Sequence, residues 1–300
     1  MLPFVFLDES KLGPFHPFGI ACAIGFFLWD WAVMRLAERR GFDRKDFRVC
    51  TLWILVMGTL FAWLIDAVFY HPPGHSVVST LFAFQGFSST GAIVGALVGG
   101  IVWSRVFIGK NDEGAWKLTK REKPMSVLAS TEVVVATWPL AWAAGRLGCA
   151  LIHDHPGVVV AKGTLGSLFS VAWPLGPDDG THHVLGPLHV VTGGSTARYD
   201  LGLLEFFILA AIAIYFATTW KKNWKLGSYT IVAGLTYGPL RFLLDFLRES
   251  EGPGAELRHG ALTFAQYWSL AVIGVALYLL AKRRREAAAE PAADPVSSTS

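Results

Sequence analysis

Two arginines lie within apolar segments of the chain, Arg146 in the run GRLGC and Arg241 in the run YGPLRFLLDFLR. An ionisable side chain is costly in a membrane-spanning helix, so each arginine indicates a functional site with an anionic partner. In a bilayer the natural partner is a phospholipid phosphate. Two guanidiniums converging on one phosphate form bidentate, charge-assisted hydrogen bonds that lysine cannot match.

The residues around Arg241 have helical spacing. Tyr237, Arg241 and Asp245 are four residues apart and Arg248 follows three later, which places them on one helix face. Asp245 can therefore orient both arginines. The alternative is that Asp245 and Arg248 form an interfacial ion pair that marks the helix end.

A run of three titratable residues follows the Arg146 segment. His153 and His155 flank Asp154, which combines a proton acceptor at neutral pH with an acid that can orient it. Two alternatives stay open: polar residues that cap the helix and open a loop, or half of a zinc or copper site. Three histidines could complete such a site: His182, His183 and His189. No metal ligand is assigned, and we expect no cofactor, because the sequence has no nucleotide-binding loop or redox motif.

Cys149 suggests a rival mechanism. It lies three residues after Arg146 and four before His153, positions that share a helix face. A thiolate paired with imidazole could accept an acyl group. A buried free cysteine more often behaves as a small apolar residue.

The elements that must position these residues are membrane-spanning helices. Hydrophobic residues make up 53% of the chain and charged residues 16%, and the mean hydropathy is +0.43, which indicates an integral membrane protein. Several apolar stretches approach the roughly 20 residues that cross a bilayer. We predict an all-α polytopic fold with seven transmembrane helices: Phe15–Leu36, Val49–Phe69, Ser88–Ile108, Met125–Ile152, Leu201–Trp220, Gly227–Leu247 and Phe264–Ala281.

The basic residues predict the orientation. Lysines and arginines cluster after the first, third, fifth and seventh stretches, and such clusters mark the cytoplasmic side. The N-terminus is then outside, the C-terminus is cytoplasmic, and the nine histidines lie on or near the outer face. Because topology accounts for the net charge of +3, we predict no nucleic-acid partner.

Three further segments carry structural predictions. Residues 153–200 contain short β-prone runs between glycines and prolines, which predicts a small strand-containing periplasmic cap between the fourth and fifth helices. The segment after Tyr70 has an apolar portion that could lie along the membrane interface. Residues 1–285 form the transmembrane domain, and the Ala-, Pro- and Ser-rich residues 286–300 are expected to be a disordered cytoplasmic tail.

Glycines in the third stretch recur every four residues. Gly91, Gly95 and Gly99 more often allow close helix packing than bind a ligand.

An ordered series of motifs resembles the bacterial prolipoprotein diacylglyceryl transferase family of the inner membrane. The series runs through LGPFHPFGI, GFSSTGAIVGALVGG, GRLG, YGPLRFLLDFLR and LTFAQYWS. The resemblance implies seven transmembrane helices with an outside N-terminus. It also implies that Arg146 and Arg241 bind phosphatidylglycerol and take part in catalysis. The implied reaction moves a diacylglyceryl group from phosphatidylglycerol to the lipobox cysteine thiol of a prelipoprotein and releases glycerol phosphate.

The chain departs from the family pattern where the thiol would be handled. Thr90 replaces a histidine in the glycine-rich motif, and threonine is no base at neutral pH. Cys149 replaces an asparagine, Asp154 a glutamate and Phe18 a tyrosine; Tyr199 lies near a usual histidine position. The family glutamate is retained: Glu205.

The resulting hypothesis is a transferase whose site faces the periplasm within a lipid-accessible helical bundle. The predicted catalytic residues are Arg146, Arg241, His153, Asp154 and His155. The predicted substrate-binding residues are Ser89, Thr90, Gly91, Cys149, Tyr199, Glu205, Tyr237, Asp245 and Arg248. The predicted partners are phosphatidylglycerol, the prelipoprotein signal peptide and membrane lipid. The alternatives are a relative without catalysis, or with another acceptor, that binds anionic lipid or lipoprotein, and a lipid transporter, which the lack of detectable repeat halves disfavours.

Overall fold

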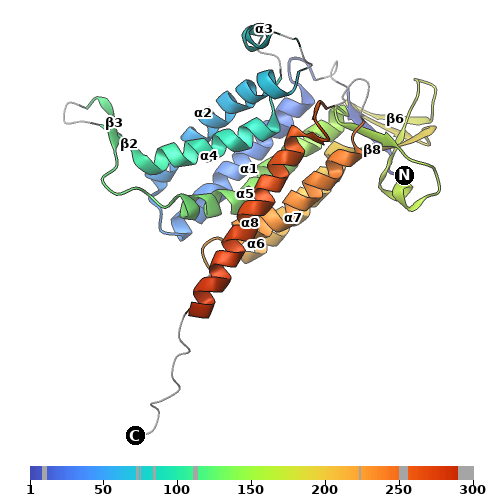
Figure 1. Ribbon diagram of the computed structural model, residues 1–300. Coiled ribbons are helices and arrows are strands. Elements are labelled where there is room, and N and C mark those ends of the chain that lie inside the picture. Colours follow the sequence, from blue (N-terminus) through green and yellow to red (C-terminus); the bar gives the residue numbers. More distant parts are fainter. Residues whose placement is uncertain are drawn as a thin grey trace.

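A computed structural model describes residues 1–8, 12–71, 74, 76–83, 86–110, 114–222, 224–249 and 256–289. Seven helices of 17 to 26 residues form one bundle (Figure 1). Each corresponds to one predicted stretch. They are α1 (Pro17–Arg39), α2 (Arg44–Phe69), α4 (Ser89–Arg105), α5 (Val127–Ile152), α6 (Leu201–Thr219), α7 (Ser228–Leu244) and α8 (Phe264–Ala289).

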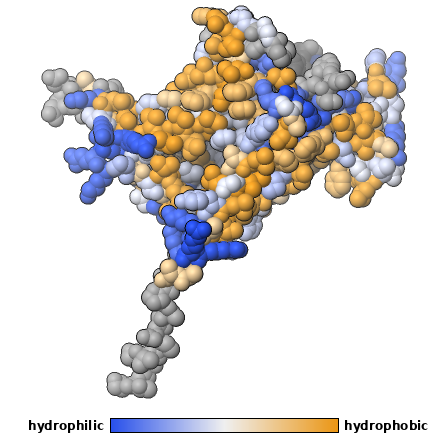
Figure 2. Space-filling view, viewed as in Figure 1, coloured by the Kyte–Doolittle hydropathy of each residue, from blue (hydrophilic) through white to orange (hydrophobic). Residues whose placement is uncertain are grey.

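Six helices in the described residues are long and apolar enough to cross a membrane. The chain is therefore a polytopic membrane protein. Apolar side chains cover the visible flank of the bundle (Figure 2), and Phe27 and Ile214 are 70% and 67% exposed. Such exposure is expected of residues whose solvent is lipid.

The third predicted span is shorter than expected. The prediction extended it from Ser88 to Ile108, but α4 ends at Arg105 and is not among the six. The chain continues as β2 (Val106–Lys110), which pairs with β3 (Trp116–Lys120) in an antiparallel hairpin. This hairpin projects from one end of the bundle (Figure 1). β-Branched and aromatic residues here favour a strand over a continued helix.

The glycines of α4 lie directly against the backbone of α2. A Cβ atom added at Gly91, Gly95 or Gly99 would come within 2.4, 2.1 or 2.5 Å of a carbonyl oxygen of α2. The packing interpretation of these glycines is therefore confirmed, since a larger residue would push the helices apart.

This packing predicts opposite effects of one substitution at two positions. Gly95→Ala should destabilise the protein by about 1–3 kcal/mol through overpacking. Gly100→Ala has nothing within 4 Å of the added Cβ and should be neutral or slightly stabilising, because alanine favours the helix. Unfolding in detergent followed by circular dichroism measures both; equal stabilities would contradict the packing argument.

The region 153–200 contains the predicted strands. One sheet has the order β4 (Pro156–Val159), β8 (Thr196–Asp200) and β5 (Val171–Trp173). The other places β7 (Leu188–Thr192) between β6 (Thr181–Leu185) and β1 (Phe4–Leu7), so the N-terminus adds a strand that was not predicted. These sheets lie at one end of the bundle (Figure 1). We refer to β1 with residues 156–200 as the cap.

A carboxylate closes one loop of the cap. Asp179 accepts hydrogen bonds from the backbone N–H groups of Leu175 and Ser195 and from the Ser195 hydroxyl. These donors lower the pKa of Asp179 to about 2. Because the folded pKa is depressed, the contribution to loop stability is present above the unfolded pKa and is lost as the pH falls towards 2.

The predicted interfacial segment and tail are partly described. α3 (Val77–Ala83) lies apart from the bundle (Figure 1), and its Phe82 is 79% exposed. α8 continues to Ala289, eight residues beyond the predicted end at Ala281. The remaining tail, residues 290–300, lies outside the described residues.

Candidate functional site

The two arginines singled out by the sequence converge on one carboxylate. Arg146 lies near the end of α5, Arg241 near the end of α7, and Glu205 in the first two turns of α6. Arg146 Nε is 2.9 Å from Glu205 Oε2, and Arg241 Nε is 4.0 Å from Glu205 Oε1. All three residues are buried. The anion on which the guanidiniums converge is thus part of the chain.

Two further residues fix this cluster. The Tyr237 hydroxyl donates a hydrogen bond to Glu205 Oε1. Asp245 forms an ion pair with Arg241 and accepts a hydrogen bond from the Thr263 hydroxyl. Buried charges require such partners, because an unpaired charge in a low dielectric is costly.

The pair Asp245 and Arg248 is not a surface feature. Asp245 is 0% exposed, and Arg248 Nε lies 3.7 Å from its carboxylate and 3.2 Å from Glu256 Oε2. The ion pair of the alternative interpretation is therefore present at the end of α7, but it is buried and is joined to Arg241 through Asp245. Arg248 and Glu256 extend the network of alternating charges outward from Arg241.

His155 and Asp154 lie beside the arginines. His155 Nε2 is 3.3 Å from Arg146 Nη1, and His155 Nδ1 is 2.5 Å from Asp154 Oδ1. A guanidinium can only donate, so Nε2 accepts from Arg146 and the ring proton on Nδ1 faces the carboxylate. This arrangement gives an oriented imidazole whose basic nitrogen faces the cluster.

His153, the other histidine of the run, points away from the cluster. Its Nδ1 is 2.5 Å from Asp200 Oδ2, its Nε2 is 3.0 Å from the carbonyl oxygen of Val5, and its ring stacks on Phe4 at 3.8 Å. With both nitrogens bonded, His153 connects α5 to the cap. The backbone of His153 is left-handed (φ 52°), and the chain turns at this residue. The side chain therefore points away from the arginines, and its contacts do not support the predicted catalytic role.

The metal alternative receives limited support. In the described part of the chain, ligand atoms of Cys149, Asp154 and His155 lie within 4.8 Å of one another. However, Arg146 Nη1 occupies the lone pair of His155 Nε2 and is 3.9 Å from Cys149 Sγ, and a fixed cation opposes a metal ion there. The predicted completing histidines lie on the cap strands β6 and β7: His182, His183 and His189.

The sequence model described as prolipoprotein diacylglyceryl transferase matches residues 10–282. This chain belongs to that family. The resemblance seen in the ordered motifs is thus confirmed.

Relatives that carry the enzyme name align along most of the chain. One is the phosphatidylglycerol–prolipoprotein diacylglyceryl transferase of Helicobacter pylori (strain Shi470), which is 26% identical over 278 residues, or 88% of this chain and 87% of the relative. Another is the enzyme of that name from Chromohalobacter salexigens, which is 23% identical over 284 residues, or 91% of each chain.

Thr90, which replaces the histidine of the family motif, forms a hydrogen bond in the structure. The Thr90 hydroxyl accepts a hydrogen bond from the Tyr70 hydroxyl at 3.1 Å. Ser89 begins α4, where the hydroxyl of the preceding Ser88 caps the helix. Tyr70 was not predicted, because nothing in the sequence distinguishes it from an interfacial aromatic residue.

Two other predicted substrate-binding residues have mainly structural contacts. Gly91 packs against the α2 backbone. Tyr199 lies in β8 against Gly157 and Gly166 of the cap. Cys149, by contrast, lies beside Arg146 as its helical spacing predicted.

Proposed function

We propose that this protein transfers the diacylglyceryl group of phosphatidylglycerol to the lipobox cysteine thiol of a prelipoprotein and releases glycerol phosphate. The observation that carries the proposal is the buried Arg146–Glu205–Arg241 cluster with an oriented imidazole, His155, at its edge. The enzyme name of the relatives supports it.

The arginines are assigned to the phosphate. Glu205 forms an ion pair with Arg146 Nε, and Arg146 Nη1 faces His155 and Cys149. We assign the phosphodiester to this Nη edge and to Arg241, with Tyr237 and Asp245 fixing the cations. As the carbon–oxygen bond breaks, charge grows on the departing phosphate, and preorganised cations stabilise it.

His155 is assigned to the thiol. When the substrate phosphate engages Arg146 Nη1, this donor leaves His155 Nε2, and the freed nitrogen takes the thiol proton. The thiolate then attacks the glyceryl carbon that bears the phosphate oxygen. A carbon–sulfur bond forms, the carbon–oxygen bond breaks, and glycerol phosphate departs with the electron pair. Asp154 stabilises the imidazolium that results. Arg146 repels this imidazolium, and the negative charge of the departing phosphate offsets that repulsion.

The orientation of the site belongs to the same proposal. Arg146 and Arg241 lie near the C-terminal ends of α5 and α7, and the cap lies at that end of the bundle (Figure 1). Hydrophilic side chains gather at the other end, around the end of α8 and the β2–β3 hairpin (Figures 1 and 2). Because basic clusters favour the cytoplasm, we place the site and the cap on the periplasmic face of the bacterial inner membrane. We also propose seven spans, with α4 included.

The direct test is conversion of a fluorescent lipobox peptide in phosphatidylglycerol proteoliposomes. The expected product carries a diacylglyceryl thioether. A folded protein that binds the phospholipid and forms no product would favour the alternative of a relative without catalysis.

A second experiment concerns Cys149. Its thiol lies next to Arg146 and within 4.8 Å of the His155 ligand atom, so the geometry permits a covalent intermediate. Under the proposed direct transfer, Cys149→Ser should keep turnover within about threefold of the parent, since serine preserves the small volume and the contact with Arg146. Loss of turnover in a folded Cys149→Ser protein would instead support a mechanism in which Cys149 takes part covalently.

A further inference from the structure

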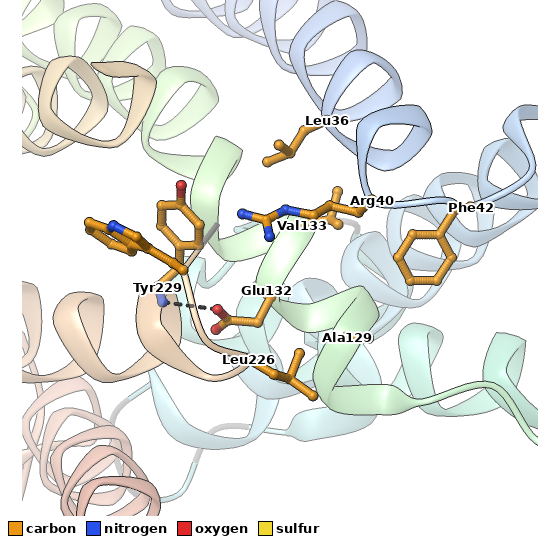
Figure 3. A pocket seen from close by; sticks show the side chains of 9 residues that line it. Leu36, Arg40, Phe42, Ala129, Glu132, Val133, Leu226 and Tyr229 are labelled. Carbon is orange, nitrogen blue, oxygen red and sulfur yellow. Dashed lines mark hydrogen bonds between the residues drawn. The ribbon is translucent and has the colours of Figure 1, made fainter. Parts of the chain in front are cut away.

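A cavity of about 170 Å³ opens at the end of the bundle opposite the arginine cluster. It lies between α1, α5 and the loop that joins α6 to α7 (Figure 3). Glu132 lines it from α5, fourteen residues before Arg146, which corresponds to roughly 21 Å along the helix. The cavity is therefore distinct from the proposed transfer site.

The acidic side chain of this cavity is already satisfied. Glu132 Oε2 accepts from the Tyr229 N–H at 3.0 Å, and Glu132 Oε1 accepts from the N–H and hydroxyl of Thr230 at 2.8 and 2.6 Å. The carboxylate thus neutralises the positive N-terminus of α7. It has no need of a cation from a ligand.

The basic side chain of the cavity has donors to spare. Within the described part of the chain, the Arg40 guanidinium makes one hydrogen bond, from Nη2 to the Lys222 carbonyl at 3.5 Å. Figure 3 shows this guanidinium extending towards the space between Val133 and Tyr229. A guanidinium has five N–H donors, so the cavity favours an occupant that accepts hydrogen bonds and is negatively charged.

The surroundings of the cavity combine positive charge with lipid-facing apolar groups. The loop between α6 and α7 carries exposed lysines, and Arg283 reaches the N-terminus of α7 through Ser228 at 3.0 Å. Leu226 lines the cavity and is 55% exposed, beside Trp224, a residue type enriched at membrane interfaces. Basic pockets between membrane helices bind the headgroups of anionic lipids.

We propose that this cavity binds the phosphate of an anionic phospholipid from the leaflet at the basic end of the bundle. Arg40 binds the phosphate, and the acyl chains pass Leu226 into the bilayer. The volume supports a headgroup alone, because pockets that enclose a whole drug-sized ligand measure about 300–1,000 Å³. The site is separate from catalysis and holds a resident lipid at the junction of three helices.

The test uses full-length protein in phosphatidylcholine nanodiscs with a phosphatidylglycerol probe that carries a diazirine near its headgroup. Peptide mapping should find the probe on residues 224–229. Arg40→Gln should reduce this labelling roughly tenfold, as loss of charge-assisted hydrogen bonds predicts. The matched control is Arg39→Gln, which removes the same charge from the exposed neighbouring position and should leave the labelling unchanged.

A second variant tests the cavity without altering charge. Ala129→Leu adds volume to the lining and should reduce labelling as Arg40→Gln does, in protein that remains monodisperse. Equal labelling of all variants, or equal labelling by a phosphatidylcholine probe, would overturn the site. If glycerol 3-phosphate competes at the concentration of the lipid, the site binds a soluble phosphate ester, and the assignment to a phospholipid is wrong. Labelling at this end is independent of transferase activity, so failure of one proposal is distinguishable from failure of the other.

Discussion

We expect replacement of His155 with glutamine to lower kcat by roughly 10²–10⁴-fold, the range typical of removing a general base. Glutamine can retain hydrogen bonds to Arg146 and Asp154 but cannot accept the thiol proton. The effect should therefore appear in kcat, with little change in phosphatidylglycerol binding. Turnover of a lipobox peptide in proteoliposomes, together with lipid binding by the same variant, measures both.

The control is the other histidine of the run. His153→Gln removes contacts with Asp200 and Val5 that lie outside the arginine cluster. It should destabilise the protein by about 1–3 kcal/mol while retaining most of kcat at temperatures where it is folded. The opposite pattern, with turnover lost in His153→Gln and kept in His155→Gln, would refute the assignment of the base.

The difference between these histidines shows where sequence reasoning reaches its limit. The expectation that Cys149 and His153 share a helix face assumed that α5 continues past Ile152. His153 instead adopts a left-handed conformation that ends the helix, which reverses the chain and brings His155 back to Arg146. Left-handed residues other than glycine are uncommon, so the sequence offered no clear signal for this turn.

The arginine pair was predictable for a different reason. The apolar stretches predict α5 and α7 to within a few residues, and the constant rise of a helix is enough to place Arg146 and Arg241 towards the same end of the bundle. Their shared partner could not be derived in this way. Glu205 was identified through the family resemblance, and its position between two guanidiniums depends on the packing of α5, α6 and α7.

The short strands illustrate a related limit. The alternation expected of a cap was visible in residues 153–200, where several β-prone runs lie between turn residues. The four residues of β1 carry no such context, because their partner β7 lies more than 180 residues away in the sequence. Pairing at that distance is decided by tertiary structure and has no local pattern.

The second large effect is expected at Arg146, where the planar shape of the guanidinium is needed as well as its charge. Arg146→Lys should lower kcat by roughly 10²–10³-fold, the loss that follows removal of a donor to a developing anion. Lysine keeps the charge but presents no planar fork, so it cannot hold Glu205 through one edge and offer the other to a phosphate. Turnover measured in phosphatidylglycerol proteoliposomes gives the size of the effect.

Arg258→Lys is the matched control, because Arg258 contacts a loop carbonyl of Ala261 and lies outside the cluster. Turnover of this variant should stay within about twofold of the parent.

Glu205→Gln tests whether the phosphate binds to the arginine pair, because it removes the negative charge and nearly preserves the side-chain shape. It leaves Arg146 and Arg241 without their shared anion, so destabilisation of about 3–5 kcal/mol is expected, and phosphatidylglycerol should restore part of it by supplying the missing negative charge. If the phospholipid stabilises Glu205→Gln no more than the parent protein, the phosphate binds elsewhere and the arginine pair serves the fold alone.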